Sequence, residues 1–385
     1  MPWRSMGNAS DIDIKAALKA LYLRIRAGIL GFPCLFRRKN LESKPLDFKN
    51  ILFIRVDRIG DMVLSTPAFA AIKARWPRSR LTVLASSANA GVLKNNPHVD
   101  EVIIYSPDIT PSERKEILKG IRDRAFDLAL DPYDDCELRT AWLAWQSKAD
   151  ISIGYRFAGR ESFFNGPVLA PRPGRHFVDS ALELLAQIGC PPVNRQPIIY
   201  LDEMEEIEAE KWLKSEGLGA KPILAIHPGG YYETQRWPRE HFASLVRLIC
   251  ERGDMDIIAF GAPDEKVFLN HIAAETSGFP HIFAERNIRM FLAILSRCQV
   301  LVCNNSGPLH CATALGIPTI SFMGPTDKDR WHPLGEGHIV LRRDDLPCIG
   351  CGLGHCRIKT HDCMKSIYPT AVLAKTDHFI DTSAK

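Results

Sequence analysis

Short apolar runs separated by amphipathic stretches recur along most of the chain. In its first part the apolar runs, each predicted to be a buried strand, lie at residues 50–56, 81–85, 101–105 and 127–131. The pattern then restarts, with predicted strands at 223–227, 256–260, 299–303 and 318–323. Predicted helices occupy the intervals, at residues 62–75, 176–189, 202–216, 239–252, 264–277, 287–297 and 307–316. Strands that alternate with helices form parallel βαβ units, so the pattern predicts an α/β protein with two doubly wound parallel-sheet domains in series.

The break between the two repeats sets the predicted domain boundaries. The run 190–197 (CPPVNRQP) has the composition of a linker. We therefore expect an N-terminal extension at 1–48, a first Rossmann-like domain at 49–197 and a second at 198–385. In open parallel sheets, ligands bind outside the carboxyl ends of the strands. A site in a cleft between the two domains is therefore expected.

An amphipathic helix is predicted at residues 11–30, ahead of the first strand. Its apolar residues recur at steps of three and four: Ile14, Leu18, Leu21, Ile25 and Ile29. Charged residues lie roughly opposite, at Asp11, Lys15, Lys19 and Arg26. Gly31 ends the helix, and a basic triplet follows at 37–39. The segment 11–40 is typical of an interfacial helix on an anionic membrane, which we favour over the alternative of a helix docked on the protein body.

Charge and composition narrow the class of protein. The chain has 385 residues, 46% of them hydrophobic and 24% charged, which excludes a disordered chain and a polytopic membrane protein. Residues 1–40 hold eight Lys or Arg against two Asp, whereas the remainder has a net charge of −2, so no nucleic-acid partner is expected. No apolar run approaches the ~20 residues that span a bilayer. Since no secretory signal is recognisable either, we expect a cytoplasmic protein with reduced thiols.

Two strand-to-helix turns carry the candidate chemistry. After the first predicted strand the chain bends at Gly60, and Asp61 follows at the start of a helix. A carboxylate there can act as a general base or simply cap the helix, and spacing alone favours the cap. The second turn, Asn304 to Pro308, opens directly into a helix, and this context favours phosphate binding by backbone N–H groups, with His310 as a further donor. Two further loops are expected at the same cleft, at 227–239 and 324–327.

Taken together and in order, these segments resemble glycosyltransferase family 9, the heptosyltransferases of lipopolysaccharide core assembly and their relatives. The resemblance rests on ILFIRVDRIGDMVLSTPAFAAIKARWP (51–77), AIHPGG with QRWPREHF (225–242), FGAPDE (260–265) and NNSGPLHCATALGIPTISFMGPTD (304–327). It runs from about Asn50 to Ile367 and leaves out the first 45 residues.

The resemblance implies a GT-B architecture with the acceptor in the first domain and a nucleotide-diphospho-sugar, typically ADP-heptose, in the second. It implies inverting transfer to a lipid-linked saccharide at the inner face of the plasma membrane, without a divalent metal. The family's catalytic carboxylate falls on Asp61, and its acidic residue near the nucleotide ribose falls on Glu265. Positive potential for the leaving diphosphate would come from the amides around Ser306 and Gly307 and from Arg236.

Two positions depart from the family pattern. Asn305 stands where the family often has Asp, and Gln235 where it often has Lys before the basic-Trp-Pro motif. Both departures favour the alternatives of another donor sugar or nucleotide, or of a non-catalytic scaffold with the same fold. Five cations of the first domain could meet acidic groups of the acceptor, although each is more simply interpreted as a solvated surface charge: Arg55, Arg58, Arg156, Arg160 and His176.

A cysteine cluster lies close to the end of the chain, within residues 348–363. Its members are Cys348, Cys351, Cys356 and Cys363, with His355 and His361 between them. Four thiolates fit a tetrahedral structural zinc ion, which we predict, with an iron–sulfur cluster or plain thiols as the alternatives. The seven other cysteines are expected to be small apolar core residues, at positions 34, 136, 190, 250, 298, 303 and 311.

Two other classes of function predict different features. An NAD-dependent oxidoreductase needs G-x-G-x-x-G after its first strand, where this chain has VDRIGD at 56–61. A nucleic-acid adaptor built on the cysteines and the basic end would bind with steep salt dependence, which the net negative body disfavours. The sequence therefore favours a glycosyltransferase.

Overall fold

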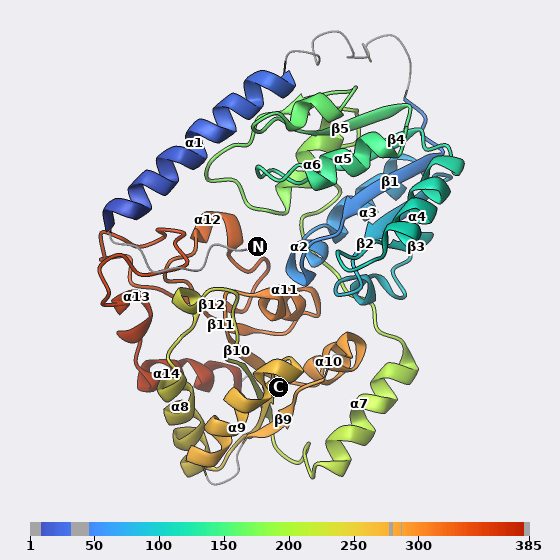
Figure 1. Cartoon of the computed structure of the whole chain (residues 1–385). Coiled ribbons are helices and arrows are strands. Elements are labelled where there is room, and N and C mark those ends of the chain that lie inside the picture. The colour runs from blue at the N-terminus through green and yellow to red at the C-terminus, as the bar shows by residue number, and fades with distance from the viewer. Residues whose placement is uncertain (1–8, 32–45, 277–279, 286, 381–385) are drawn as a thin grey trace.

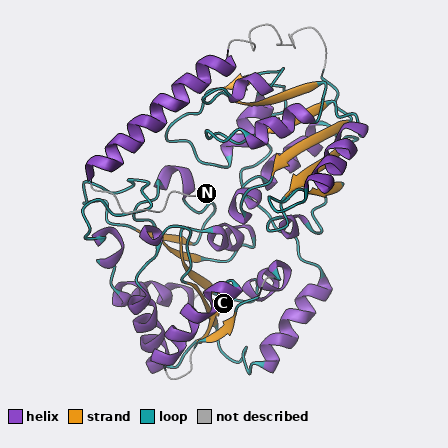
Figure 2. Cartoon of the chain, in the orientation of Figure 1, coloured by secondary structure: helices purple, strands orange, loops and turns teal. Residues whose placement is uncertain are grey.

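The computed structural model describes residues 9–31, 46–276, 280–285 and 287–380. Within these residues, twelve strands form two parallel six-stranded sheets. Figure 1 shows the sheets in separate halves of the molecule, and Figure 2 shows the helices around them. The predicted fold class, two doubly wound α/β domains, is confirmed.

The first sheet has the strand order β3-β2-β1-β4-β5-β6. Its strands are β1 (Asn50–Arg55), β2 (Arg80–Ala85), β3 (Glu101–Ile104), β4 (Leu128–Asp131), β5 (Ile151–Tyr155) and β6 (Val168–Leu169). Strand β1 pairs in parallel with β2 on one side and β4 on the other, so that Leu52 lies between Thr82 and Ala129. A strand covered on both faces must be apolar almost throughout, which explains the unbroken hydrophobic run in β1.

The second sheet has the order β12-β11-β10-β7-β8-β9. Its strands are β7 (Ile223–His227), β8 (Asp256–Phe260), β9 (His281–Phe283), β10 (Val300–Asn304), β11 (Thr319–Phe322) and β12 (His338–Leu341). Read from β9, this order is the same as that of the first sheet read from β3. Strands β7 and β10 therefore correspond to β1 and β4, and each pair marks the point where the strand order reverses. Ligands bind at this point in open α/β sheets.

Helices cover both faces of each sheet. In the first half they are α2 (Ile59–Val63), α3 (Thr66–Arg75), α4 (Pro111–Asp123), α5 (Arg139–Gln146) and α6 (Asp179–Ala186). In the second half they are α7 (Glu203–Ser215), α8 (Arg239–Arg252), α9 (Lys266–Glu275), α10 (Ile288–Leu295), α11 (Gly307–Ala314), α12 (Lys328–Trp331), α13 (Asp362–Lys365) and α14 (Pro369–Ile380). One buried cluster contains Phe53 and Phe69 of the first half together with Leu301 and Leu309 of the second. The two halves therefore share a continuous apolar core.

Helix α1 (Ala9–Gly31) runs along the outside of the molecule, away from both sheets (Figure 1). The predicted helix is thus present. The basic triplet at 37–39, also assigned to this region, lies outside the described residues. Among the helices that the structure describes, none combines the length and the apolar character needed to cross a bilayer.

The predicted helix 62–75 is wrong as a single element, because the chain forms α2 and α3 instead. Pro67 lacks the N–H that would bond to the carbonyl of Val63 in a continuous helix. The hydroxyl of Thr66 donates to that carbonyl instead, at 2.8 Å. The sequence pattern did not predict four of the strands, β5, β6, β9 and β12. β6, β9 and β12 are short, half-buried edge strands without a long apolar run, and β5 is interrupted by Ser152 and Gly154.

Candidate functional site

Asp61 lies in the turn from β1 into α2, at the carboxyl end of the first sheet. Arg58 occupies the N-cap position, and Asp61 is the third helical residue, with a hydrogen bond to the backbone of Arg58, so a capping role remains beside that of a base. Its half-buried side chain lies near the carboxylate of Asp57. Burial, together with the charge of Asp57, raises the pKa of Asp61 to about 7, against the opposing charges of Arg55 and Arg58. A carboxyl group with this pKa can exchange a proton near neutral pH.

Arg55, the last residue of β1, stabilises the start of this turn. It is fully buried and donates to Asp57 and to the hydroxyl of Ser65, both at 3.0 Å. Its guanidinium also lies 5.1 Å from the ring of Phe177. One Nη of Arg55 and one carboxylate oxygen of Asp57 are buried without a hydrogen-bond partner. Unpaired buried polar atoms are costly, so these two atoms mark a place where a polar ligand group would be stabilised.

The turn from β10 into α11 forms the corresponding corner of the second half. Ser306 precedes the helix in an extended conformation and makes no side-chain cap, while Pro308 has no N–H and the Leu309 N–H donates to the carbonyl of Ser306 at 3.0 Å. A helix N-terminus without a cap offers its free N–H groups and a partial positive charge to an anion. Asn305 donates to the carbonyl of Trp331 at 3.3 Å, which ties the turn to α12.

The two turns meet directly. A side chain at Gly60 would place its Cβ 3.0 Å from Cδ2 of His310 and 3.4 Å from Cα of Gly307. Only glycine allows α2 and α11 to approach this closely without a local shift. Burial lowers the pKa of His310 to about 3, so its ring is neutral at physiological pH. The fold thus packs α2, which contains Asp61, against the turn that begins α11 in the second half.

Glu265 lies against the loop after β7. Its carboxylate accepts from the backbone N–H of Ala262 at 2.9 Å and lies 3.9 Å from Nε2 of His227. A Cβ at Gly229 would come within 2.8 Å of the His227 ring and closer still to Glu265. Because Gly229 leaves room for it, the carboxylate stands beside the backbone at the end of the central strand.

Gln235 and Arg236 occupy the neighbouring loop. The Gln235 amide lies 3.5 Å from the hydroxyl of Thr326, which joins two of the loops expected at the site. The exposed Arg236 guanidinium donates twice to the carbonyl of Gly230, at 2.9 and 2.7 Å. In this conformation Arg236 therefore stabilises the loop, and two of its N–H groups are engaged by the carbonyl of Gly230.

Asn304 connects these loops, although the sequence analysis gave it no individual role. Its buried amide donates to the carbonyls of Pro228 and Gly229 at 2.8 and 2.9 Å. Its carbonyl accepts from the backbone of Trp237 at 2.8 Å. One side chain therefore ties both ends of the loop between β7 and α8 to the end of β10. Its place at the carboxyl end of a predicted buried strand, next to Asn305, is the signal that could have found it.

Comparison with known proteins identifies the family. The sequence profile of glycosyltransferase family 9 (heptosyltransferase) matches residues 114–360. The chain belongs to glycosyltransferase family 9. Lipooligosaccharide heptosyltransferase 2 of Haemophilus ducreyi is 23% identical over 353 residues, covering 86% of this chain and 99% of the relative. Lipopolysaccharide heptosyltransferase 2 of Escherichia coli is 24% identical over 319 residues, covering 76% of this chain and 87% of the relative.

Solved structures of the family share the fold. A family 9 glycosyltransferase from Veillonella parvula has a TM-score of 0.78 and 22% identity, covering 89% of this chain and all of its own. E. coli ADP-heptose lipopolysaccharide heptosyltransferase II has a TM-score of 0.72 and 21% identity, covering 87% and 100%. An E. coli heptosyltransferase with ADP-2-deoxy-2-fluoro heptose has a TM-score of 0.66 and 18% identity, covering 86% and 99%. The predicted GT-B class is thus confirmed, and the protein is a glycosyltransferase.

In this family 9 protein, the predicted site residues fall into two groups. Asp61 lies on α2, and Asn305, Ser306, Gly307, Pro308 and His310 lie on the turn into α11 and its first residues, and the two elements meet where Gly60 approaches Gly307 and His310. Gln235, Arg236 and Glu265 lie on the neighbouring loops after β7 and β8.

The predicted surface positions of the first-domain cations are wrong for three of them. Arg55, Arg160 and His176 are buried, whereas Arg58 and Arg156 are exposed as expected. Arg160 forms a fully buried ion pair with Asp131. His176 accepts from the backbone of Val178 through Nδ1, so its Nε2 carries the proton and donates to the carbonyl of His332 at 2.9 Å. These side chains hold the fold and the contact between the halves.

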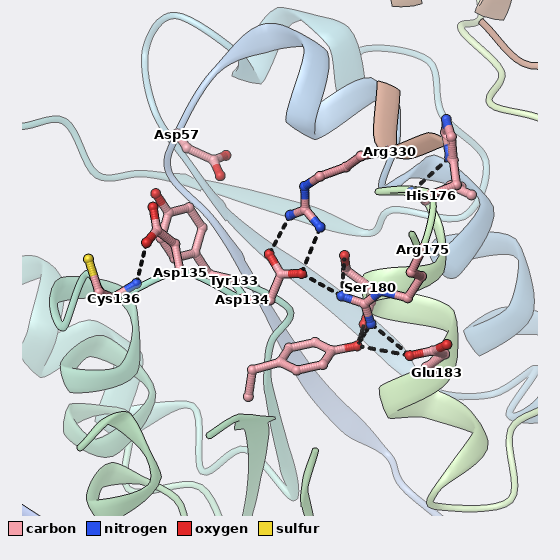
Figure 3. A network of polar contacts seen from close by, with 12 residues as sticks. Asp57, Tyr133, Asp134, Asp135, Cys136, Arg175, His176, Ser180, Glu183 and Arg330 are labelled. Carbon is pink, nitrogen blue, oxygen red and sulfur yellow. Dashed lines mark hydrogen bonds and ion pairs between the residues drawn. The ribbon is translucent and has the colours of Figure 1, made fainter. Parts of the chain in front are cut away.

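A largely buried ion-pair network also joins the two halves, and no motif of the sequence indicates it (Figure 3). Asp134, in the loop after β4, accepts from Arg330 of α12 at 2.6 and 3.1 Å. Arg175 pairs with the same carboxylate and with Glu183. Although burial alone would raise it, the hydrogen bonds and charges of Arg330 and Arg175 hold the pKa of Asp134 below its ordinary value. Spatial neighbours from four separate segments form this network, so no local pattern marks it.

The four cysteines predicted to bind zinc line one cavity of about 340 Å³, together with His355 and His361. In the part of the chain that the structure describes, however, no three His, Cys, Asp or Glu side chains are arranged to hold a metal ion. Burial, together with the three neighbouring thiols, raises the pKa of Cys363 to about 11. The zinc site therefore stays a prediction. Of the other cysteines, 190, 298, 303 and 311 are buried as expected, 136 and 250 are half-buried, and 34 lies outside the described residues.

Proposed function

We propose that this glycosyltransferase moves a heptose from ADP-heptose to a lipid-linked saccharide in lipopolysaccharide core synthesis, with inversion at the anomeric carbon. The observation that carries the proposal is the close packing of α2, the helix that contains Asp61, against the start of α11, where no side chain caps the helix. The similarity to heptosyltransferases named for lipopolysaccharide and lipooligosaccharide supports it. In this proposal, the side-chain amides of Asn305 and Gln235 contact the donor through neutral hydrogen bonds, in place of the family's charged side chains.

In the proposed reaction, Asp61 takes the proton from the acceptor hydroxyl. The hydroxyl oxygen attacks the anomeric carbon from the face opposite the diphosphate. The bond from that carbon to the diphosphate oxygen breaks, and its electron pair stays on the diphosphate. A general base is most effective when its pKa lies near the working pH, and the pKa of Asp61 at about 7 meets this requirement.

The leaving diphosphate requires fixed positive potential. The N–H groups around Ser306 and Gly307 supply it in our proposal, with Pro308 pre-shaping the first turn, His310 as a neutral neighbour and Arg236 as the nearby cation. Glu265 would bind the ribose hydroxyls. No step is assigned to a divalent metal, so turnover should not depend on an added divalent metal ion.

The proposal also places the enzyme at the inner face of the plasma membrane. A lipid-linked acceptor stays in the bilayer, so the acceptor half must work beside it. Helix α1 contacts that half through Arg26, which donates to the carbonyls of Ala158 and Cys136 at 2.8 and 2.6 Å.

We separately propose a structural zinc ion at the four cysteines. The cysteine segment supports the donor loop, because the hydroxyl of Thr234 donates to the carbonyl of Leu353 and His361 donates to that of Thr234, both at 2.7 Å. Zinc would require the thiols to turn toward one another. Metal analysis of the purified chain should find about one zinc per chain, lost in Cys351→Ser. A zinc-free, folded and active protein would overturn this proposal.

A thermal-shift titration with ADP, UDP, GDP, CDP and TDP tests the donor. A ligand that binds only the folded state at 100 times its dissociation constant adds ~2.7 kcal/mol of stability. We expect selective stabilisation by ADP and ADP release on addition of the acceptor. Selective stabilisation by another nucleotide would replace ADP-heptose as the donor. Stabilisation by none of them, with no turnover, would favour the scaffold.

A further inference from the structure

Helix α1 presents an apolar face to the outside of the molecule. Five large side chains at helical spacing are between 54% and 70% exposed: Leu18, Leu21, Tyr22, Ile25 and Ile29. Single exposed apolar residues are ordinary in soluble proteins, but a continuous stripe along one helix face marks an interaction surface. We call these five residues the α1 stripe.

The opposite side of α1 holds the helix on the protein. Leu23, Ala27 and Leu30 are half-buried there, and Arg26 makes the two hydrogen bonds to the first domain. A Cβ at Gly159 would lie 3.0 Å from Leu30, so the helix passes close to the loop after β5. This docking fixes the rotation of α1 about its axis. The stripe is therefore directed outward by packing.

The charged residues of α1 indicate which class of partner the stripe would contact. Each residue turns the helix by about 100°. Lys19 follows Leu18 and Arg24 precedes Ile25, so one exposed cation stands on either side of the stripe. The segment 18–30 contains no acidic residue. An apolar stripe bordered by cations fits an anionic lipid surface, where the apolar residues enter the headgroup boundary and the cations reach lipid phosphates.

We propose that the α1 stripe docks this enzyme on an anionic bilayer, with α1 lying parallel to the membrane plane. The inference rests on the proposed function in one respect, since a lipid-linked acceptor explains why the enzyme needs the surface. It adds which face of the chain meets the lipid. The loop that contains Cys136 also contains Asp134 of the interdomain network, so the docked helix holds the acceptor half beside the bilayer.

Vesicle co-sedimentation of the full-length chain tests this inference. Vesicles of phosphatidylglycerol and phosphatidylcholine in about equal amounts should bind the wild type, and pure phosphatidylcholine should bind it several-fold less. The double variant Leu21→Asp, Ile25→Asp should lose binding at least about tenfold, because it places two charges in the stripe. The matched control is Met204→Asp, Val267→Asp, which changes two equally exposed apolar residues on α7 and α9 and should bind as the wild type does.

Three results would overturn the inference. The wild type could fail to bind anionic vesicles, the stripe variant could bind as well as the control, or light scattering could show that the stripe joins two copies of the chain. All five side chains are exposed, so the variant should keep the wild-type melting temperature. Turnover with a water-soluble acceptor should also be unchanged in the stripe variant. Vesicle binding without any turnover would instead count against the proposed function alone.

Discussion

The two halves of the molecule have the same strand order but place different chemistry where that order reverses. In the first half, the segments at the ends of β1 and β4 carry ionisable groups: Arg55, Asp57, Asp61, Asp131 and Asp134. In the second half, the equivalent segments after β7 and β10 carry glycines, the Asn304 amide, a helix N-terminus and two histidines whose pKa values are lowered by burial.

The difference follows from what each half must do in the proposed reaction. Activating a hydroxyl requires a group that changes its protonation state near neutral pH, and close carboxylates in a partly buried turn provide one. Holding a diphosphate requires donors that do not change, and backbone N–H groups at a helix start are such donors. The same strand order therefore places groups that titrate near neutral pH on one side of the site and groups that do not titrate on the other.

The largest expected effect comes from removing the titrating group. Asp61→Asn should reduce kcat by about 10²–10⁴-fold, because the amide cannot accept the proton. Its dissociation constant for ADP should stay near that of the wild type, since the donor corner is untouched. Rapid-quench turnover and calorimetry measure the two quantities. A variant with normal kcat would show that Asp61 has only a structural role.

The second-largest expected effect comes from Asn304, in the half whose groups do not titrate near neutral pH. Asn304→Ala removes three hydrogen bonds and leaves their buried partners unpaired, so it should lower the free energy of unfolding by about 2–4 kcal/mol and weaken ADP binding. Asn305→Ala is the matched control, because Asn305 makes one longer hydrogen bond at a half-buried position. Denaturant unfolding of the two variants gives the comparison. Equal losses would contradict the role assigned to Asn304.

A smaller effect is expected at the contact between the halves. Arg330→Gln should lower the free energy of unfolding by about 1–3 kcal/mol, because Asp134 keeps Arg175 but loses its two bonds across the interface. Lys328→Gln, on the same helix but at an exposed position, should be neutral. Thermal unfolding distinguishes them. Wild-type stability in Arg330→Gln would mean that the network does not hold the halves together.

The sequence predicted the fold class because eight of the strands contain apolar runs, and seven of these are buried almost throughout, whereas β3 alternates between half-buried and exposed residues. It failed at short edge strands such as β6 and β12, where half-buried side chains leave no such run. The break after α2 escaped because Pro67 lies inside an otherwise helical pattern. Local pattern indicates a strand most clearly where burial is complete.

The candidate site was predicted where it lies on one local segment. Asp61 and the 305–310 turn follow directly from strand–turn–helix patterns. The ion pairs of Asp134 could not be predicted, because Arg175 is distant from it in the sequence and Arg330 belongs to the other half. The burial of Arg160 was also missed, because its neutralising partner Asp131 lies on a different element of the first half.

The pH dependence of kcat/KM tests the central claim most directly. The pKa of Asp61 is raised to about 7, and only its carboxylate form can accept a proton. The free enzyme should therefore lose kcat/KM about tenfold per pH unit below pH 7 and reach a plateau above it. His310 stays neutral over this range, so the donor corner should not contribute. A kcat/KM that is flat from about pH 5 to 8 would contradict the assignment of Asp61 as the titrating base.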